Sequence, residues 1–115
     1  MANYQDLRVW QKAMDLTIEV YALCSLLPRT ETYGLANQMK RAAVSIPSNI
    51  AEGQRRLTKK DSASFAGIAL GSLGELETQL ILASKLYRID INKALLACSE
   101  VGMMCSGLIK SLRSA

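Results

Sequence analysis

Residues 41–53 read R-A-A-V-S-I-P-S-N-I-A-E-G, in contrast to the leucine-rich sequence on either side. If this stretch is helical, one face carries four polar residues at steps of four, four and three: Arg41, Ser45, Asn49 and Glu52. Small and branched apolar residues lie beside this polar line. A helix that only packs in a core does not need such a line. Its side chains must therefore be solvated, meet a matching polar surface, or carry out chemistry.

Pro47 lies in the middle of the same stretch. Inside a helix, proline removes one backbone hydrogen bond and collides with the preceding turn, at a cost of about 3 kcal/mol. The helix would either kink at this position or break there, with Ser45 or Ile46 as a new N-cap. Because the apolar spacing continues through Ile46 and Ile50 without a shift, we expect a kinked but continuous helix.

The remaining sequence predicts a helical bundle, because apolar residues recur at alternating steps of three and four. We expect helices at about residues 4–27, 31–55, 59–87 and 91–112, with N-caps from Asn3, Thr58 and Asp90. The links at about residues 28–30, 56–59 and 88–90 are short, which makes neighbouring helices antiparallel. The expected fold class is therefore all-α, an antiparallel up-down-up-down four-helix bundle, with residues 1–115 as a single domain.

The first helix has more apolar residues than one buried face requires. A heptad pattern predicts its core face: Leu7, Trp10, Met14, Thr17, Tyr21 and Cys24. A second apolar set flanks that face: Val9, Leu16, Ile18, Val20 and Leu23. The fourth helix has a similar surplus, around Leu96 and Met103. Surplus apolar faces on a small bundle predict a partner helix surface, and so an oligomer.

The third helix has small residues in its interior, among them Gly67, Gly71 and Gly74. Each helical glycine costs about 1 kcal/mol relative to alanine, which favours a close approach to the equally small-residue-rich second helix. Glu75 would then reach across to the polar line and complete a structural network: Arg41, Ser45, Asn49, Glu52 and Glu75. The alternative is a Mg²⁺ site of carboxylates that also uses Glu77.

The composition excludes several classes of enzyme. The chain has no histidine, which rules out histidine-based acid–base and nucleophilic chemistry and imidazole metal sites. Cys24, Cys98 and Cys105 form no C-x-x-C pair and lie in apolar helical patterns, so we expect buried, reduced thiols. No lysine or histidine lies at helical spacing to activate Ser45. We therefore expect no enzyme activity, no catalytic residues, no metal and no cofactor.

The N-terminus, M-A-N-Y-Q-D, lacks the basic and apolar regions of a secretory signal. Charged residues interrupt each apolar run before it reaches the roughly 20 residues that span a bilayer. Together with the pattern of thiols, these features lead us to expect a cytoplasmic protein with no membrane partner.

The positive charge is concentrated in one part of the chain. The formal net charge is +4, and residues 29–60 contain seven basic and two acidic side chains. Five of the basic residues are candidate phosphate contacts: Lys40, Arg55, Arg56, Lys59 and Lys60. The alternative is an ordinary solvated surface. With one Phe, one Trp and four Tyr, the chain lacks a platform for stacking bases, so nucleic-acid binding would be directed at the backbone and sensitive to salt.

Three motifs resemble a known family: D-L-R-V-W-Q-K-A at residues 6–13, Q-M-K-R-A-A-V-S-I-P-S-N-I-A-E-G at residues 38–53, and G-S-L-G-E-L-E-T-Q-L at residues 71–80. They are similar to the 23S rRNA-intervening-sequence proteins, an S23-type family of bacterial four-helix bundles. The resemblance extends to the accessory protein of diversity-generating retroelements. It implies a bundle that assembles into a ring, a pentamer, and a basic surface that acts on nucleic acid. The family supplies no agreed catalytic residues.

Two functions remain open at this point. The first is a non-enzymatic, homo-oligomeric bundle that binds nucleic acid, RNA rather than DNA, through its basic surface. The second is a protein–protein interaction scaffold with no direct role in nucleic-acid binding.

Overall fold

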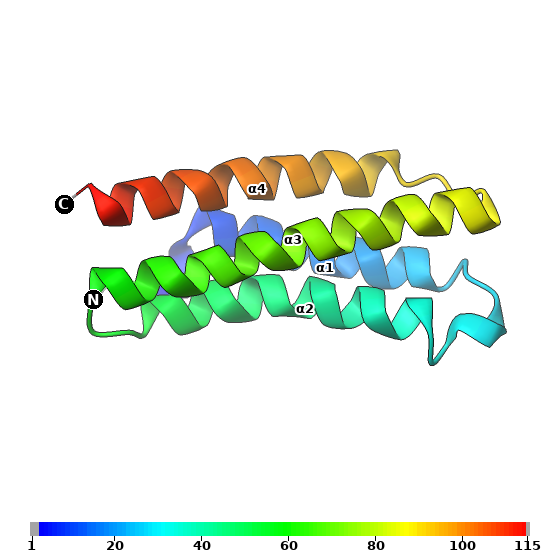
Figure 1. Cartoon of the computed structure of the whole chain (residues 1–115), viewed down its shortest axis with the longest axis horizontal. Coiled ribbons are helices and arrows are strands. Elements are labelled where there is room, and N and C mark those ends of the chain that lie inside the picture. Colours follow the sequence, from blue (N-terminus) through cyan, green and yellow to red (C-terminus); the bar gives the residue numbers. More distant parts are fainter. Residues whose placement is uncertain (1–2, 115) are drawn as a thin grey trace.

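The structure, a computed structural model, describes residues 3–114. It contains four long helices, α1 (Arg8–Cys24), α2 (Leu35–Gln54), α3 (Lys59–Tyr87) and α4 (Asn92–Arg113). Two short 3-10 helices, η1 (Tyr4–Asp6) and η2 (Arg29–Glu31), precede α1 and α2. Each long helix runs antiparallel to the one before it, and the α2–α3 turn lies at the same end as the C-terminus of α4 (Figure 1). The predicted all-α, up-down four-helix bundle is confirmed.

Local capping explains where the helices begin. Asn3 accepts a hydrogen bond from the Gln5 amide and so caps η1, with the result that α1 begins at Arg8 rather than near residue 4. Thr58 accepts a hydrogen bond from the amide of Asp61 at 3.1 Å, which confirms the predicted N-cap of α3. Asp90 accepts one from the amide of Asn92 at 3.0 Å, but the N-cap position of α4 is Ile91, one residue after the predicted Asp90.

The second helix is continuous through Pro47, as predicted. Because proline has no N–H, the carbonyl oxygen of Ala43 loses its partner within the helix. The hydroxyl of Thr17, on α1, lies 3.1 Å from that oxygen and 2.8 Å from the carbonyl oxygen of Ala13. The single hydroxyl proton of Thr17 is shared between these two oxygens, so Ala43 gains a shared donor from the neighbouring helix, which lowers the cost of the proline.

The core lies along the axis of the bundle. The expected inward residues of α2 and of the middle of α3 are buried: Leu35, Met39, Ala42, Ile46, Ile50, Ala69, Leu73, Leu76, Leu80 and Ala83. In α4 the buried set includes Cys98, Val101 and Cys105. The three cysteines are free and buried, and burial raises the pKa of the Cys98 thiol to about 12 and that of Cys105 to about 11.

The core face predicted for α1 is only partly right: Cys24 is buried and Leu7 and Trp10 pack against the core, but other members of the set are not in it. Met14 and Tyr21 are 38% and 47% exposed, whereas the residues predicted as a flanking surplus form the core together with Ala13: Val9, Leu16, Val20 and Leu23. Both sets have helical spacing, so periodicity alone does not distinguish them. The small side chain of Ala13 and the branched ones beside it fit the narrow centre of the bundle. Met14 and Tyr21 of the predicted set are exposed instead, and Met14 lines a groove between α1 and α2.

The glycines of α3 do not serve a close approach to α2. A Cβ atom added at Gly67, Gly71 or Gly74 would meet no atom within 4 Å. The close contact between the two helices lies instead at Gly53, where a Cβ atom would come within 3.0 Å of the carbonyl oxygen of Ser62. The glycine-rich surface of α3 is therefore exposed, and the fold does not account for it.

By length and composition, α4 is apolar enough to cross a membrane, with a mean hydropathy of 1.3, contrary to the expectation from sequence. Such a helix is weak evidence of a membrane span, since core helices of bundles pass the same test. In the structure, α4 packs against α1 and α3 through its buried face.

Candidate nucleic-acid interface

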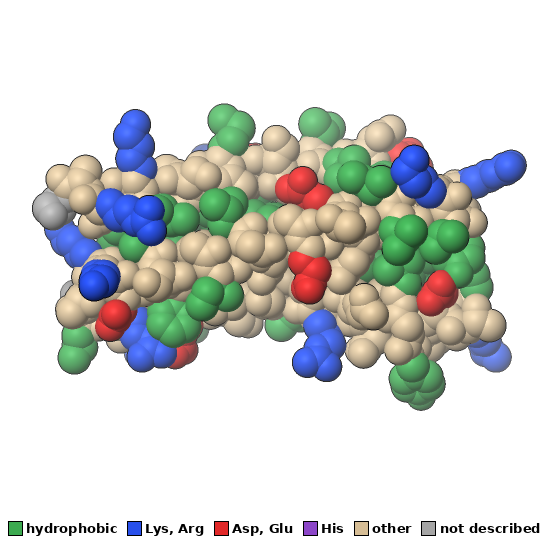
Figure 2. Space-filling view, viewed as in Figure 1, with side chains coloured by type: hydrophobic (Ala, Val, Ile, Leu, Met, Phe, Trp, Pro, Cys, Tyr) green, Lys and Arg blue, Asp and Glu red, His purple; other side chains and the backbone are tan. Residues whose placement is uncertain are grey.

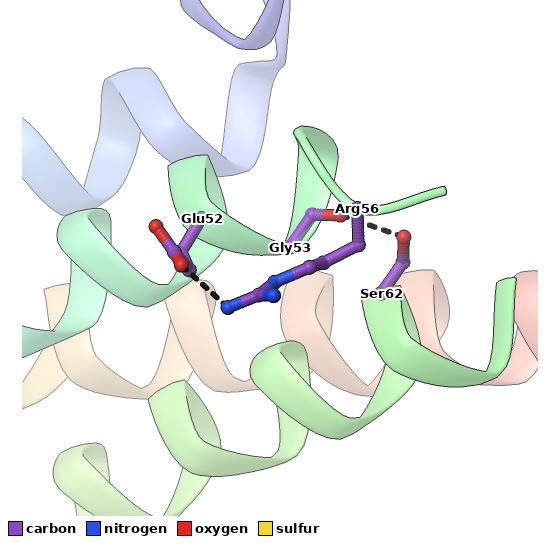
Figure 3. A network of polar contacts seen from close by, with 4 residues as sticks. All are labelled: Glu52, Gly53, Arg56 and Ser62. Carbon is purple, nitrogen blue, oxygen red and sulfur yellow. Dashed lines mark hydrogen bonds and ion pairs between the residues drawn. The ribbon is translucent and has the colours of Figure 1, made fainter. Parts of the chain in front are cut away.

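The basic turn between α2 and α3 is held in place by contacts of both helices. The Ser62 hydroxyl on α3 donates a hydrogen bond of 2.6 Å to the carbonyl oxygen of Gly53, near the end of α2 (Figure 3). The missing side chain of Gly53 makes this approach possible. With Thr58 capping α3 on the other side of the turn, the backbone from residue 53 to residue 62 is anchored at both ends.

The two arginines of the turn are partly engaged within the protein. Arg56 forms a 2.6 Å ion pair with Glu52 (Figure 3). The guanidinium carbon of Arg56 also lies 4.4 Å from the centre of the Phe65 ring. Arg55 lies 5.6 Å from the centre of the Tyr4 ring. Both residues are exposed, so these surface contacts orient the guanidinium groups without removing them from solvent.

The two lysines of the turn, Lys59 and Lys60, lie in the first turn of α3, next to basic residues at the end of α4. Lys59 and Lys60 line a pocket of about 420 Å³ together with Leu112 and Arg113, from the last turn of α4. Lys110 lies one turn before Arg113 on the same helix. Among residues 3–114, none of these four basic residues forms an ion pair. Figure 2 shows basic side chains gathered at this end of the molecule.

Sequence reasoning missed Lys110 and Arg113, which are about 50 residues from the turn along the chain. The signal was nevertheless available. In an up-down bundle the C-terminus of the fourth helix must return to the end where the second helix meets the third. Basic residues in the last turn of that helix therefore add to the charge of the α2–α3 turn.

Lys40 does not join this cluster. It lies 15 residues before Arg55 on α2, or about 22 Å along the axis at 1.5 Å per residue. Its ammonium group is 5.0 Å from the centre of the Tyr21 ring, and the residue is half-buried against α1. The structure thus brings together Arg55, Arg56, Lys59 and Lys60, and leaves Lys40 apart.

Only part of the polar line of α2, Ser45 and Asn49, belongs to a hydrogen-bond network with α3. The hydroxyls of Ser45 and Ser72 lie 2.8 Å apart, and the side-chain amide of Asn49 donates to the carbonyl and hydroxyl oxygens of Ser45 at 2.8 and 3.0 Å. Ser72 thus takes the place in this network that was expected for Glu75.

The other expected members of this network lie outside it. Arg41 and Glu75 are exposed, and within the described part of the chain neither forms a hydrogen bond or ion pair with the line. Glu52 pairs with Arg56 instead. Solvation explains the difference. Charged side chains at the edge of the α2–α3 seam stay hydrated, because burying them in the seam would cost desolvation free energy. Among residues 3–114, no three Cys, Asp or Glu side chains are grouped so that they could hold a metal ion.

Comparisons with known proteins agree with this architecture. The model of the 23S rRNA-intervening sequence protein family matches residues 5–107. A crystal structure from Bacteroides thetaiotaomicron, described as a protein of unknown function from the S23 ribosomal protein family, superposes with a TM-score of 0.79. The two sequences are 22% identical, and the match covers 89% of this chain and 95% of the other, which supports a shared fold. No curated protein matches the chain. On the extent of the family match, the chain belongs to the 23S rRNA-intervening sequence protein family.

Proposed function

We propose that this protein is a non-enzymatic, homo-oligomeric bundle that binds nucleic acid through phosphates at its basic end. The observation that carries the proposal is the meeting of two basic segments there, Lys59 and Lys60 from α3 with Lys110 and Arg113 from α4. The N-terminus of α3 adds its own positive dipole to these side chains, partly offset by the exposed Asp61 in the same turn. Flexible cations on a fixed backbone favour contact with phosphate oxygens over the reading of bases.

RNA is the expected form of nucleic acid, because the family is named for intervening sequences of 23S rRNA. A single copy offers few phosphate contacts and would bind weakly. Several copies in one ring, five by resemblance to the family, would present several basic ends to one RNA and so raise the overall affinity.

Self-association is supported by the exposed apolar surface on α1 and α2. Met14, Ile18 and Tyr21 are exposed on α1, and Val44 is exposed on α2. Beside them runs a groove of about 350 Å³ whose lining includes Trp10, Met14, Val44 and Pro47. Burial of apolar surface gives about 25 cal/mol per Å², so a second copy packed here would be stabilised by the hydrophobic effect.

The proposal is tested by measuring RNA affinity over a range of salt concentrations. For each phosphate contact, the slope of log K against log salt should be about −0.7 to −0.9, so the affinity should fall steeply between low and moderate salt. The variant Lys59→Ala/Lys60→Ala should lose affinity, and the slope should become less negative by about 1 to 2 for each protomer that contacts the RNA. The control Arg29→Ala/Lys85→Ala removes the same charge at the opposite end of the bundle and should bind as the wild type does.

Equal loss in both variants would assign binding to overall charge, and unchanged binding in both would reject the proposed interface. The second candidate, a protein scaffold, predicts that protein partners survive treatment with nuclease. Native mass spectrometry measures the number of copies.

A further inference from the structure

A groove runs between α3 and α4, beginning at the basic end and continuing toward the middle of the bundle. Its volume is about 650 Å³, and it is lined by Gly67, Leu70, Ser106, Ile109, Lys110, Arg113 and Ser114. The walls are largely aliphatic, from Leu70 and Ile109, and both charged residues of the lining are basic. Along α4 the groove extends from Ser106 to Ser114, about 12 Å at 1.5 Å per residue.

The α3 side of this groove is unusually bare. Gly67 belongs to the groove, Gly71 and Gly74 follow at helical spacing, and a Cβ atom at any of them would lie in open space. Each glycine costs the helix about 1 kcal/mol relative to alanine. No contact within the bundle requires these glycines. The distance between packed helices depends on the side chains at their contact, so this surface would let another helix come unusually close.

The positive charge at one end of the groove indicates a ligand with negative charge there. Lys110 and Arg113 lie at the basic end, the pocket of Lys59 and Lys60 adjoins them through Arg113, and no acidic residue lines either cavity. A ligand that fits must therefore have an apolar side along the groove and negative charge at the end over Lys110 and Arg113. The phosphate backbone of a nucleic acid would satisfy the cations but leave the aliphatic walls exposed to water.

We propose that this groove binds an acidic amphipathic helix of a partner protein. The helix would place apolar residues at i, i+3 and i+7 between α3 and α4, and its acidic residues against Lys110 and Arg113. This is the helix-in-groove mode of recognition, with the bare backbone at Gly67 allowing close contact. Lys110 and Arg113 also belong to the proposed RNA interface, so the helix and RNA would compete for these two cations, but only the helix uses the apolar walls of the groove.

The test uses a synthetic, fluorescently labelled peptide of about 20 residues, above the length of roughly 12–15 at which isolated helices are marginal, with a leucine stripe and three glutamates at one end. Its twin has lysines in place of the glutamates. Binding is measured by fluorescence anisotropy with the full chain. The acidic peptide should bind at least about tenfold more tightly than the basic twin, a difference that corresponds to about 1.4 kcal/mol.

Two matched variants locate the site. Gly67→Leu fills the groove, whereas Gly74→Leu adds the same side chain on the same helix outside its lining. Both substitutions project into open space and replace a poor helix former, so both variants should fold. Affinity for the acidic peptide should fall about tenfold in Gly67→Leu and stay within about twofold in Gly74→Leu.

Equal affinity for the two peptides, or equal effects of the two variants, would overturn the proposal. A change in sedimentation coefficient in Gly67→Leu alone, without a loss of peptide affinity, would assign the groove to a second copy of the chain. A loss of RNA affinity in Gly67→Leu without a loss of peptide affinity would assign it to nucleic acid.

Discussion

The hydroxyl of Ser62 donates a 2.6 Å hydrogen bond to the carbonyl oxygen of Gly53, and this contact fixes the end of α2 against the start of α3. The basic turn lies between these two residues. Its lysines and arginines therefore project from a backbone that is held at both ends, although the side chains themselves are exposed. The surface proposed for binding is thus positioned by two small residues that make no contact with the ligand.

Gly53→Ala should destabilise the protein, because the added Cβ atom would lie 3.0 Å from the backbone oxygen of Ser62 and 3.1 Å from the Cβ atom of Phe65. The two helices would have to move apart, at an expected cost of about 1 to 3 kcal/mol in the free energy of unfolding. Gly71→Ala is the matched control, because its Cβ atom meets nothing and should stabilise the helix by about 1 kcal/mol. Urea denaturation measures both, and the same sign of change for both variants would contradict the packing described at Gly53.

A pH-dependent contribution to stability is expected at the opposite end of the bundle. Tyr87 donates a hydrogen bond to Glu31, and Glu31 also accepts one from the amide of Leu35 at the start of α2. The Tyr87 hydrogen bond, followed by that of the Leu35 amide, lowers the pKa of Glu31 below its ordinary value of 4.5. A lowered folded-state pKa contributes stability that is present above the unfolded pKa and lost as the pH falls through the folded value.

Glu31→Gln should therefore be less stable than the wild type near neutral pH, and the difference should shrink as the pH falls below about 4.5. Urea denaturation at a series of pH values checks this, with Glu75→Gln as a control, since Glu75 is an exposed glutamate away from this contact. A stability difference that is constant from neutral to acidic pH would show that the carboxylate charge of Glu31 does not contribute.

Lys110→Ala/Arg113→Ala should weaken RNA binding to about the same extent as Lys59→Ala/Lys60→Ala, since the two pairs converge on one end of the bundle. Lys40→Ala should have little effect, because Lys40 lies about 22 Å from the cluster along α2. Filter binding at a fixed, low salt concentration compares the three variants. A larger loss in Lys40→Ala than in the α4 variant would move the interface to the side of the bundle.

Helical periodicity and turn chemistry were enough to predict the topology, because each of the four helices has a strong apolar pattern and short links leave only antiparallel neighbours. They identified only part of the core face of α1, where two apolar sets have the same spacing and only packing distinguishes Ala13 from Met14. They also placed Glu75 in the polar seam where the structure has Ser72, since spacing gives the face of a helix but not the depth of a side chain. Predicting that Lys110 and Arg113 lie near the α2–α3 turn would have required combining the up-down topology with the charge pattern.

Thr17 and Pro47 should be energetically coupled across α1 and α2. The Thr17 hydroxyl lies 3.1 Å from the carbonyl oxygen of Ala43, which Pro47 deprives of a backbone donor. Thr17→Val removes the hydroxyl at nearly constant volume and should cost about 1 to 3 kcal/mol by leaving that oxygen unpaired, whereas Thr17→Ser should cost less. In a Pro47→Ala background the restored N–H can bond to Ala43, so Thr17→Val should be milder there. A double-mutant cycle by urea denaturation should give a coupling energy of about 0.5 kcal/mol or more, and additive effects of the two substitutions would show that Thr17 does not compensate for the proline.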